Sequence, residues 1–145
     1  MKVIAVIPAR YKSTRFEGKP LVNLCGKPMI WWVHHQLCQV KGLSEIYVAT
    51  DDERIRKVCS DYGIKYVMTS DSHPTHLDRL AEFAENIESD FYININGDEP
   101  LMMPEYVERL LPTSDLNPVD FYFANAMTKI KKTVEVADIS RIKVV

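Results

Sequence analysis

Near its start the chain reads Val3-Ile4-Ala5-Val6-Ile7-Pro8-Ala9-Arg10, and residues 3–7 are continuously apolar and largely β-branched. A run of this kind is typical of a strand that is covered on both faces of a parallel sheet. It is too short for a signal-peptide core, and no small-residue cleavage site follows it. The next stretch, 8–28, is rich in Gly, Pro, Ser, Thr and cations, which predicts a long loop of the kind that commonly carries function.

Beyond this loop, strand-like and helix-like segments alternate at short spacing. Apolar periodicity predicts helices over 29–40, 53–62 and 77–84, and a further helix that begins at Pro104. Apolar and β-branched runs predict strands over 45–50, 64–68, 91–95, 120–125 and 141–145. The alternation favours an α/β fold with a doubly wound, Rossmann-like parallel or mixed sheet. Ligands of such sheets bind outside the carboxyl ends of the strands, where the loops after Ile7 and Ile95 lie.

Length and composition narrow the class of protein. The 145 residues fit one domain, 46% of them are hydrophobic and 26% are charged, as in ordinary globular proteins. A net charge of −2 provides no global basic field for nucleic acid, and no apolar run is long enough to span a membrane. Cys25, Cys38 and Cys59 fit neither a disulfide framework nor a zinc site, which indicates reduced thiols in a cytoplasmic protein.

The first loop has the chemistry of a phosphate-binding segment. Residues 8–20 hold four cations, interleaved with hydroxyl and small side chains: Arg10, Lys12, Arg15 and Lys19. Arginine can contact two phosphate oxygens at once, lysine acts as a point charge, and small neighbours let backbone N–H groups approach. The segment is not a P-loop, because Lys19, the lysine that follows its glycine, precedes Pro20 rather than Ser or Thr, and the glycine spacing is wrong. The alternative interpretation is a solvated basic loop.

The second loop places Asp98 just beyond a strand end, behind Gly97. A carboxylate there is suited to Mg²⁺, which usually takes one or two carboxylates and completes its shell with substrate phosphate oxygens. The alternative interpretation is an Asp in an ordinary turn, because residues 96–100 also have good turn chemistry.

Four motifs, in the same order along nearly the whole chain, resemble the 3-deoxy-manno-octulosonate cytidylyltransferases, the CMP-Kdo synthetase family. They are residues 7–15 with 18–21, Gly26-Lys27-Pro28-Met29-Ile30, Val48-Ala49-Thr50-Asp51-Asp52 and Gly97-Asp98-Glu99-Pro100. The acylneuraminate (sialic-acid) cytidylyltransferases are similar with looser agreement. The resemblance implies a sheet of the nucleotide-diphospho-sugar transferase type, with 1–145 as the CTP- and Mg²⁺-binding part of a cytidylyltransferase domain.

The resemblance also implies a reaction in lipopolysaccharide biosynthesis. The anomeric hydroxyl of a 3-deoxy-2-keto sugar acid, Kdo above all, would attack the α-phosphate of CTP and release pyrophosphate in the presence of Mg²⁺. The catalytic residues implied are Arg10, Arg15, Lys19 and Asp98, and Asp98 is also the implied metal ligand. The nucleotide contacts implied are Pro8, Ala9, Arg10, Ser13, Thr14, Arg15, Lys19, Arg79, Asn96 and Gly97.

Three departures from the family pattern bear on specificity and completeness. Asn96 stands where the Kdo enzymes carry Gln, and His76-Leu77 replaces a Gly-Thr pair in the loop 73–79 that helps receive the nucleotide. The family also continues past residue 145, so we expect the C-terminal part of its fold to be missing. That part carries much of the sugar pocket, the contacts of a possible homodimer and a second metal-binding Asp. Two alternatives therefore stay open: an enzyme for a sialic-type or other acid, and a non-catalytic nucleotide-binding remnant.

Overall fold

The computed structural model describes residues 1–13, 16–113 and 122–126. The chain divides into two compact units, Met1–Leu111 and Pro112–Val145, and the elements below all belong to the first. The assignment of 1–145 to a single domain stays a prediction. The strand expected over 120–125 is wrong for 122–125, where the described backbone forms no strand, and the strand expected over 141–145 lies outside the described residues. Across the described ranges, no helix is long and apolar enough to cross a membrane.

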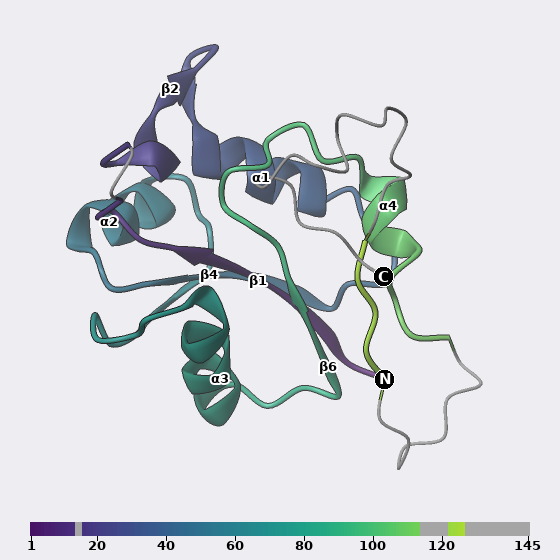
Figure 1. The fold of residues 1–145 in the computed structure, drawn as a ribbon. Helices are drawn as coiled ribbons and strands as arrows, with labels where there is room; N and C mark the ends of the chain where they lie inside the picture. Colours follow the sequence, from purple (N-terminus) through teal and green to yellow (C-terminus); the bar gives the residue numbers. More distant parts are fainter. Residues whose placement is uncertain (14–15, 114–121, 127–145) are drawn as a thin grey trace, which may run out of the picture. The chain divides into compact units, whose positions relative to one another are not determined.

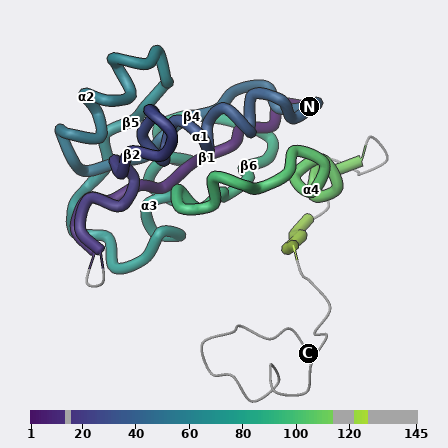
Figure 2. The backbone as a smooth tube through the Cα atoms, turned by 90° about the horizontal axis from the view of Figure 1, so that it is seen from above, coloured from purple at the N-terminus to yellow at the C-terminus, as the bar shows by residue number. Residues whose placement is uncertain are grey.

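A four-stranded parallel sheet forms the centre of the first unit (Figure 1). Its strands are β1 (Val3–Ala9), β4 (Glu45–Thr50), β5 (Tyr66–Met68) and β6 (Phe91–Asn94). They lie side by side in the order β5-β4-β1-β6 (Figure 2). This sheet confirms the predicted α/β class with a parallel sheet. The buried β-branched runs form the strands, and the amphipathic segments form the connections.

Helices cover the sheet on both faces. They are α1 (Met29–Leu37), α2 (Glu53–Asp61), α3 (His76–Asn86) and α4 (Pro104–Glu108). Alternate residues of β1 face opposite ways: Ala5 and Ile7 pack with residues of α1, α2 and α4, whereas Ile4 and Val6 pack with Phe83 of α3. The expected helices are therefore present. Helix α1 ends at Leu37 rather than at residue 40, because Val40 N–H bonds to the carbonyl of Leu37 in a tight final turn.

The composition of the stretch 8–28 predicted one long loop, but the structure shows that this stretch is interrupted by short elements. It contains the 3₁₀ helix η1 (Lys19–Leu21) and a short hairpin of β2 (Asn23–Leu24) and β3 (Lys27–Pro28). The turn residues Cys25 and Gly26 both have positive φ, 49° and 85°. Two positive φ angles are what a two-residue hairpin turn of type I′ requires. The Asn23 side chain also accepts a hydrogen bond of 2.8 Å from the Gly26 N–H.

Asparagine at position 25 is expected to stabilise the protein by up to about 1 kcal/mol, because asparagine tolerates the left-handed region better than cysteine does. The midpoint of urea unfolding at constant slope measures the change. The matched control is Cys25→Ala, which removes the same exposed thiol but keeps a β-carbon on the strained backbone. An equal gain in both variants would assign the effect to the thiol instead.

Candidate active site

The predicted loops meet at the point where the strand order reverses. From β1 the chain proceeds outward to β4 and β5, and it then returns to place β6 on the other side of β1. The carboxyl ends of β1 and β6 therefore flank the switch point, where α/β sheets bind their ligands. The loop after β1 holds the predicted cations, and the loop after β6 holds Asp98. The structure thus brings together the two segments that the sequence singled out.

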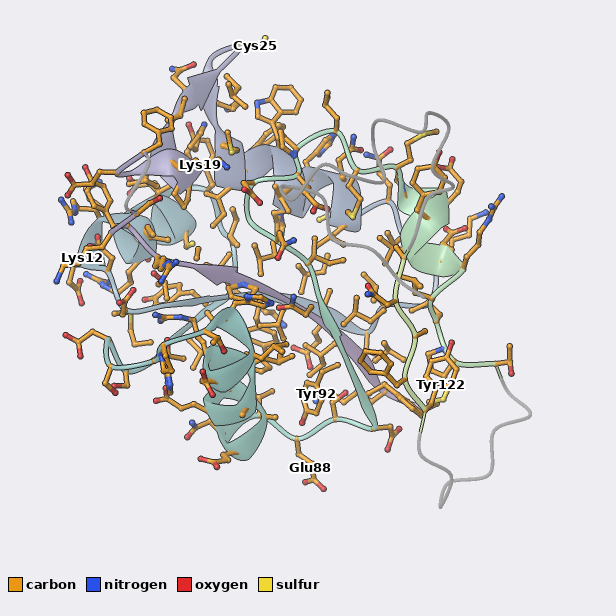
Figure 3. All side chains as sticks on the ribbon, viewed as in Figure 1. Lys12, Lys19, Cys25, Glu88, Tyr92 and Tyr122 are labelled. Carbon is orange, nitrogen blue, oxygen red and sulfur yellow. The ribbon has the colours of Figure 1, made fainter. Side chains whose placement is uncertain are left out.

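An ion pair joins these two loops. The Lys19 ammonium lies 2.5 Å from the Asp98 carboxylate, between Nζ and Oδ2. The two side chains stay 39% and 45% exposed, so both remain accessible to a ligand. Figure 3 shows Lys19 and Lys12 on the side of the molecule where β1 ends, away from Glu88 beyond α3. The predicted phosphate-binding cation and the predicted metal ligand are therefore direct neighbours.

Gly97 packs against the end of β1. A β-carbon at position 97 would lie 3.4 Å from both the Ile7 Cγ2 atom and the Pro8 carbonyl oxygen, and 3.9 Å from the Ala9 β-carbon. The backbones of the two loops consequently approach as closely as side-chain packing allows. Asn96 lies beside them, with its Nδ2 donating to Glu99 Oε1 at 3.1 Å. Nucleotide contacts by Pro8, Ala9, Asn96 and Gly97 stay predictions.

The loop after β1 carries the remaining candidates. Arg10 is exposed directly after the strand. The Ser13 hydroxyl accepts a hydrogen bond of 3.5 Å from the Phe16 N–H. Thr14 and Arg15 lie outside the described residues. The described part of the loop therefore places Arg10 directly after β1 and Lys19 against Asp98.

Arg79 has a different environment from the other predicted nucleotide ligands. It is only 4% exposed, its guanidinium donates to the Thr69 hydroxyl, and its Nη2 lies 3.3 Å from Asp51 Oδ2. It thereby connects α3 to the residues that directly follow β4 and β5. Asp51 Oδ1 is buried without a hydrogen-bond partner. Asp52, rather than Asp51, caps α2 by accepting from the Arg54 N–H at 2.9 Å.

Sequence reasoning missed a residue that holds the loop 69–75. The Glu82 carboxylate of α3 accepts from the Ser70 N–H at 2.8 Å and also bonds to His73 Nε2. The His73 side chain lowers the pKa of the Glu82 carboxyl. At the other end of this loop, Thr75 and Asp78 form a capping box at the start of α3. The spacing Asp78–Glu82, one turn apart, was the available signal for a polar face directed at this loop.

The residues at this edge suit a divalent cation only in part. Within the ranges that the structure describes, no group of three or more His, Cys, Asp or Glu residues converges as a metal site would require. Asp98 contributes a single carboxylate, which matches Mg²⁺ when substrate phosphates provide further oxygens. The donor set therefore fits a metal that arrives with a polyphosphate better than one held by the protein alone.

Comparisons with known proteins found related chains. A family model described as Cytidylyltransferase matches residues 4–145. The 3-deoxy-manno-octulosonate cytidylyltransferase of Escherichia coli is 47% identical over 110 residues, which are 76% of this chain and 45% of the relative. The 8-amino-3,8-dideoxy-manno-octulosonate cytidylyltransferase of Shewanella sp. (strain W3-18-1) is 40% identical over 148 residues, which are 100% of this chain and 60% of the relative.

The fold also matches a solved structure. The structure of CMP:2-keto-3-deoxy-manno-octonic acid synthetase complexed with CTP superimposes with a TM-score of 0.75 at 46% identity, covering 76% of this chain and 46% of that one. The chain therefore spans about half of the length of the relatives it matches. The residues matched by the family model, 4–145, include both loops of the switch point.

Proposed function

The chain belongs to the cytidylyltransferase family, and on that premise we propose that it transfers CMP from CTP to the anomeric hydroxyl of a Kdo-type sugar acid. The observation that carries this proposal is the contact between Lys19 and Asp98 across the switch point. The pair lies where α/β sheets take their ligands, and a cation beside a carboxylate suits a phosphate group and a metal ion. Relatives named for Kdo and for its 8-amino analogue support the acceptor class.

The reaction is an in-line displacement at the α-phosphorus. A bond forms from the anomeric oxygen to phosphorus while the bond to the bridging oxygen breaks, pyrophosphate departs and the hydroxyl proton is released. Negative charge grows on the leaving pyrophosphate, so catalysis rests on positioning and on nearby cations. Arg10 and Lys19 provide such charge at the described edge, with Arg15 as the third predicted cation. Ser13 adds a hydroxyl donor for a phosphate oxygen.

Mg²⁺ bound by Asp98 and the triphosphate would neutralise phosphate charge and orient the phosphates. In the ligand-free protein the Asp98 carboxylate is paired with Lys19. If Asp98 held a metal ion, the Lys19 ammonium would be free to contact the phosphate oxygens. The same ion pair therefore keeps both groups in place before the substrate arrives.

The acceptor has two candidates within the Kdo class. Relatives named for the 8-amino sugar align over 100% of this chain, whereas those named for Kdo align over 76–77%. This broader alignment favours the 8-amino sugar acid as a second candidate. The two acids differ in the group at C8, remote from the anomeric hydroxyl that reacts.

Pyrophosphate release tests the proposed reaction against two alternatives, an enzyme for sialic acids and a nucleotide-binding remnant. We expect release from CTP and Mg²⁺ with Kdo or 8-amino-Kdo, and none with a sialic acid or without an acceptor. Titration calorimetry of CTP with Mg²⁺ provides the companion measurement, with Lys19→Met as the variant expected to weaken binding. CTP binding without pyrophosphate release from any acid would indicate a nucleotide-binding remnant. Absence of CTP binding in a folded sample would contradict the site itself.

A further inference from the structure

Tyr11 closes the loop that carries the phosphate-binding candidates. It follows Arg10, and its carbonyl oxygen accepts a hydrogen bond of 2.8 Å from the Gly18 N–H. Lys19 comes directly after Gly18. The bond between Tyr11 and Gly18 therefore lies between the two predicted catalytic cations of the described loop, and it sets the separation of their backbones.

The Tyr11 ring also contacts Gly18. A β-carbon at Gly18 would lie 3.0 Å from the ring atoms Cε2 and Cζ, tighter than nine in ten real β-carbon contacts. Gly18 has φ 70°, a region that disfavours other residues. Glycine is thus favoured at position 18 both by its backbone conformation and by the ring that lies against it.

Arg54 of α2 covers the ring as well. Its guanidinium carbon lies 3.2 Å from the ring centroid. Two hydrogen bonds to the Asp52 carboxylate hold this group, from Nε to Oδ1 at 2.9 Å and from Nη2 to Oδ2 at 2.7 Å. The bond to Asp52 raises the pKa of Arg54. A bidentate pair of this kind fixes the plane of the guanidinium, and Asp52 is itself fixed as the cap of α2.

We propose that Tyr11, clamped between Gly18 and the Asp52–Arg54 pair, is a positioning residue that holds Arg10 and Lys19 at the spacing required by the triphosphate. Neither Tyr11 nor Arg54 contacts the reacting atoms in this arrangement. They act by fixing both ends of the loop before the nucleotide binds, which reduces the ordering cost of binding. The inference rests on the proposed function, which it deepens by naming an anchor on a different element, α2.

The test compares Arg54→Ala with Arg56→Ala, which removes the same charge from the same helix but pairs with Glu53 and Tyr66 instead of Tyr11. In the free protein, hydrogen exchange of the Gly18 amide should become about two- to fivefold faster in Arg54→Ala, the range of an exposed cation–π contact, and stay unchanged in Arg56→Ala. The KM for CTP should rise by the same factor in Arg54→Ala, with a smaller change in kcat. Tyr11→Phe keeps the ring and should behave like the parent.

Two results would overturn the clamp. Unchanged Gly18 exchange in Arg54→Ala would show that Arg54 does not hold the loop. An equal rise of KM in both arginine variants would assign the effect to net charge. The exchange experiment needs no nucleotide, so it decides the clamp even if the parent binds no CTP, a result that would contradict the proposed function alone.

Discussion

Asparagine in place of Asp98 is expected to lower pyrophosphate release at saturating CTP and Mg²⁺ by about two to three orders of magnitude, the usual effect of removing one charge-stabilising group from a transition state. In the ligand-free protein Asp98 is bonded to Lys19 at 2.5 Å and partly exposed. The substitution keeps the size of the side chain and its hydrogen-bonding reach. The loss therefore reports charge rather than packing.

The same variant should bind CTP about two- to fivefold more tightly than the parent when Mg²⁺ is absent, as expected for release of an exposed ion pair. Lys19 is then free for the phosphates, and a carboxylate no longer repels them. Calorimetry with and without Mg²⁺ measures the affinity of both proteins for CTP under each condition. Glu105→Gln, an exposed carboxylate in the first turn of α4, is the control for net charge. Weaker Mg²⁺-free binding by the Asp98 variant would contradict the exchange of partners between Lys19 and Asp98.

Alanine in place of Phe83 is expected to cost about 3–5 kcal/mol of unfolding free energy. Phe83 is fully buried and joins α3 to the sheet through Ile4, Val6 and Ala49. Its ring lies 5.3 Å from that of Tyr47 and 6.2 Å from that of Tyr92, which Figure 3 shows near α3. No second large side chain of α3 is fully buried among the described residues, so the cavity left by the substitution has little to fill it.

Urea unfolding measures this loss. Phe83→Leu preserves most of the volume and should cost about 1.5 kcal/mol or less. Leu77→Ala, on the same helix but 58% exposed, should change stability by no more than about 0.5 kcal/mol. A small cost for Phe83→Ala, comparable with that of Leu77→Ala, would mean that α3 does not form the core of its face of the sheet.

The fold was predictable where one pattern decided the local structure. Residues 3–7 and most of 45–50 are β-branched or apolar, and both segments are strands of the sheet. The hairpin at 23–28 was missed because Cys25-Gly26 is not among the common turn pairs, so the composition of the stretch suggested only a loop. The strand expected at 120–125 was wrong over 122–125, because an apolar run alone does not supply a partner strand.

The proximity of Lys19 and Asp98 was predictable, because cations and a carboxylate follow strand ends, where α/β sheets bind ligands. Their roles in binding and catalysis stay predictions. The environment of Arg79 was not predictable from the sequence, because its partners Asp51 and Thr69 follow two other strands. The clamp of Tyr11 by Arg54 was missed for the same reason, since only the folded chain brings α2 to the loop. Pairings of this kind depend on tertiary contacts that a single sequence does not encode locally.

The position of β1 in the sheet also determines the order in which the halves of the site can assemble during synthesis. β1 pairs with β4 through Ile4 and Glu45, but its other edge pairs with β6 through Val3 and Phe91. Contacts between residues so distant along the chain close large loops and form slowly. A growing chain can therefore complete the phosphate loop and its α2 anchor while the segment with Asp98 is still being made, so Lys19 gains its carboxylate partner last.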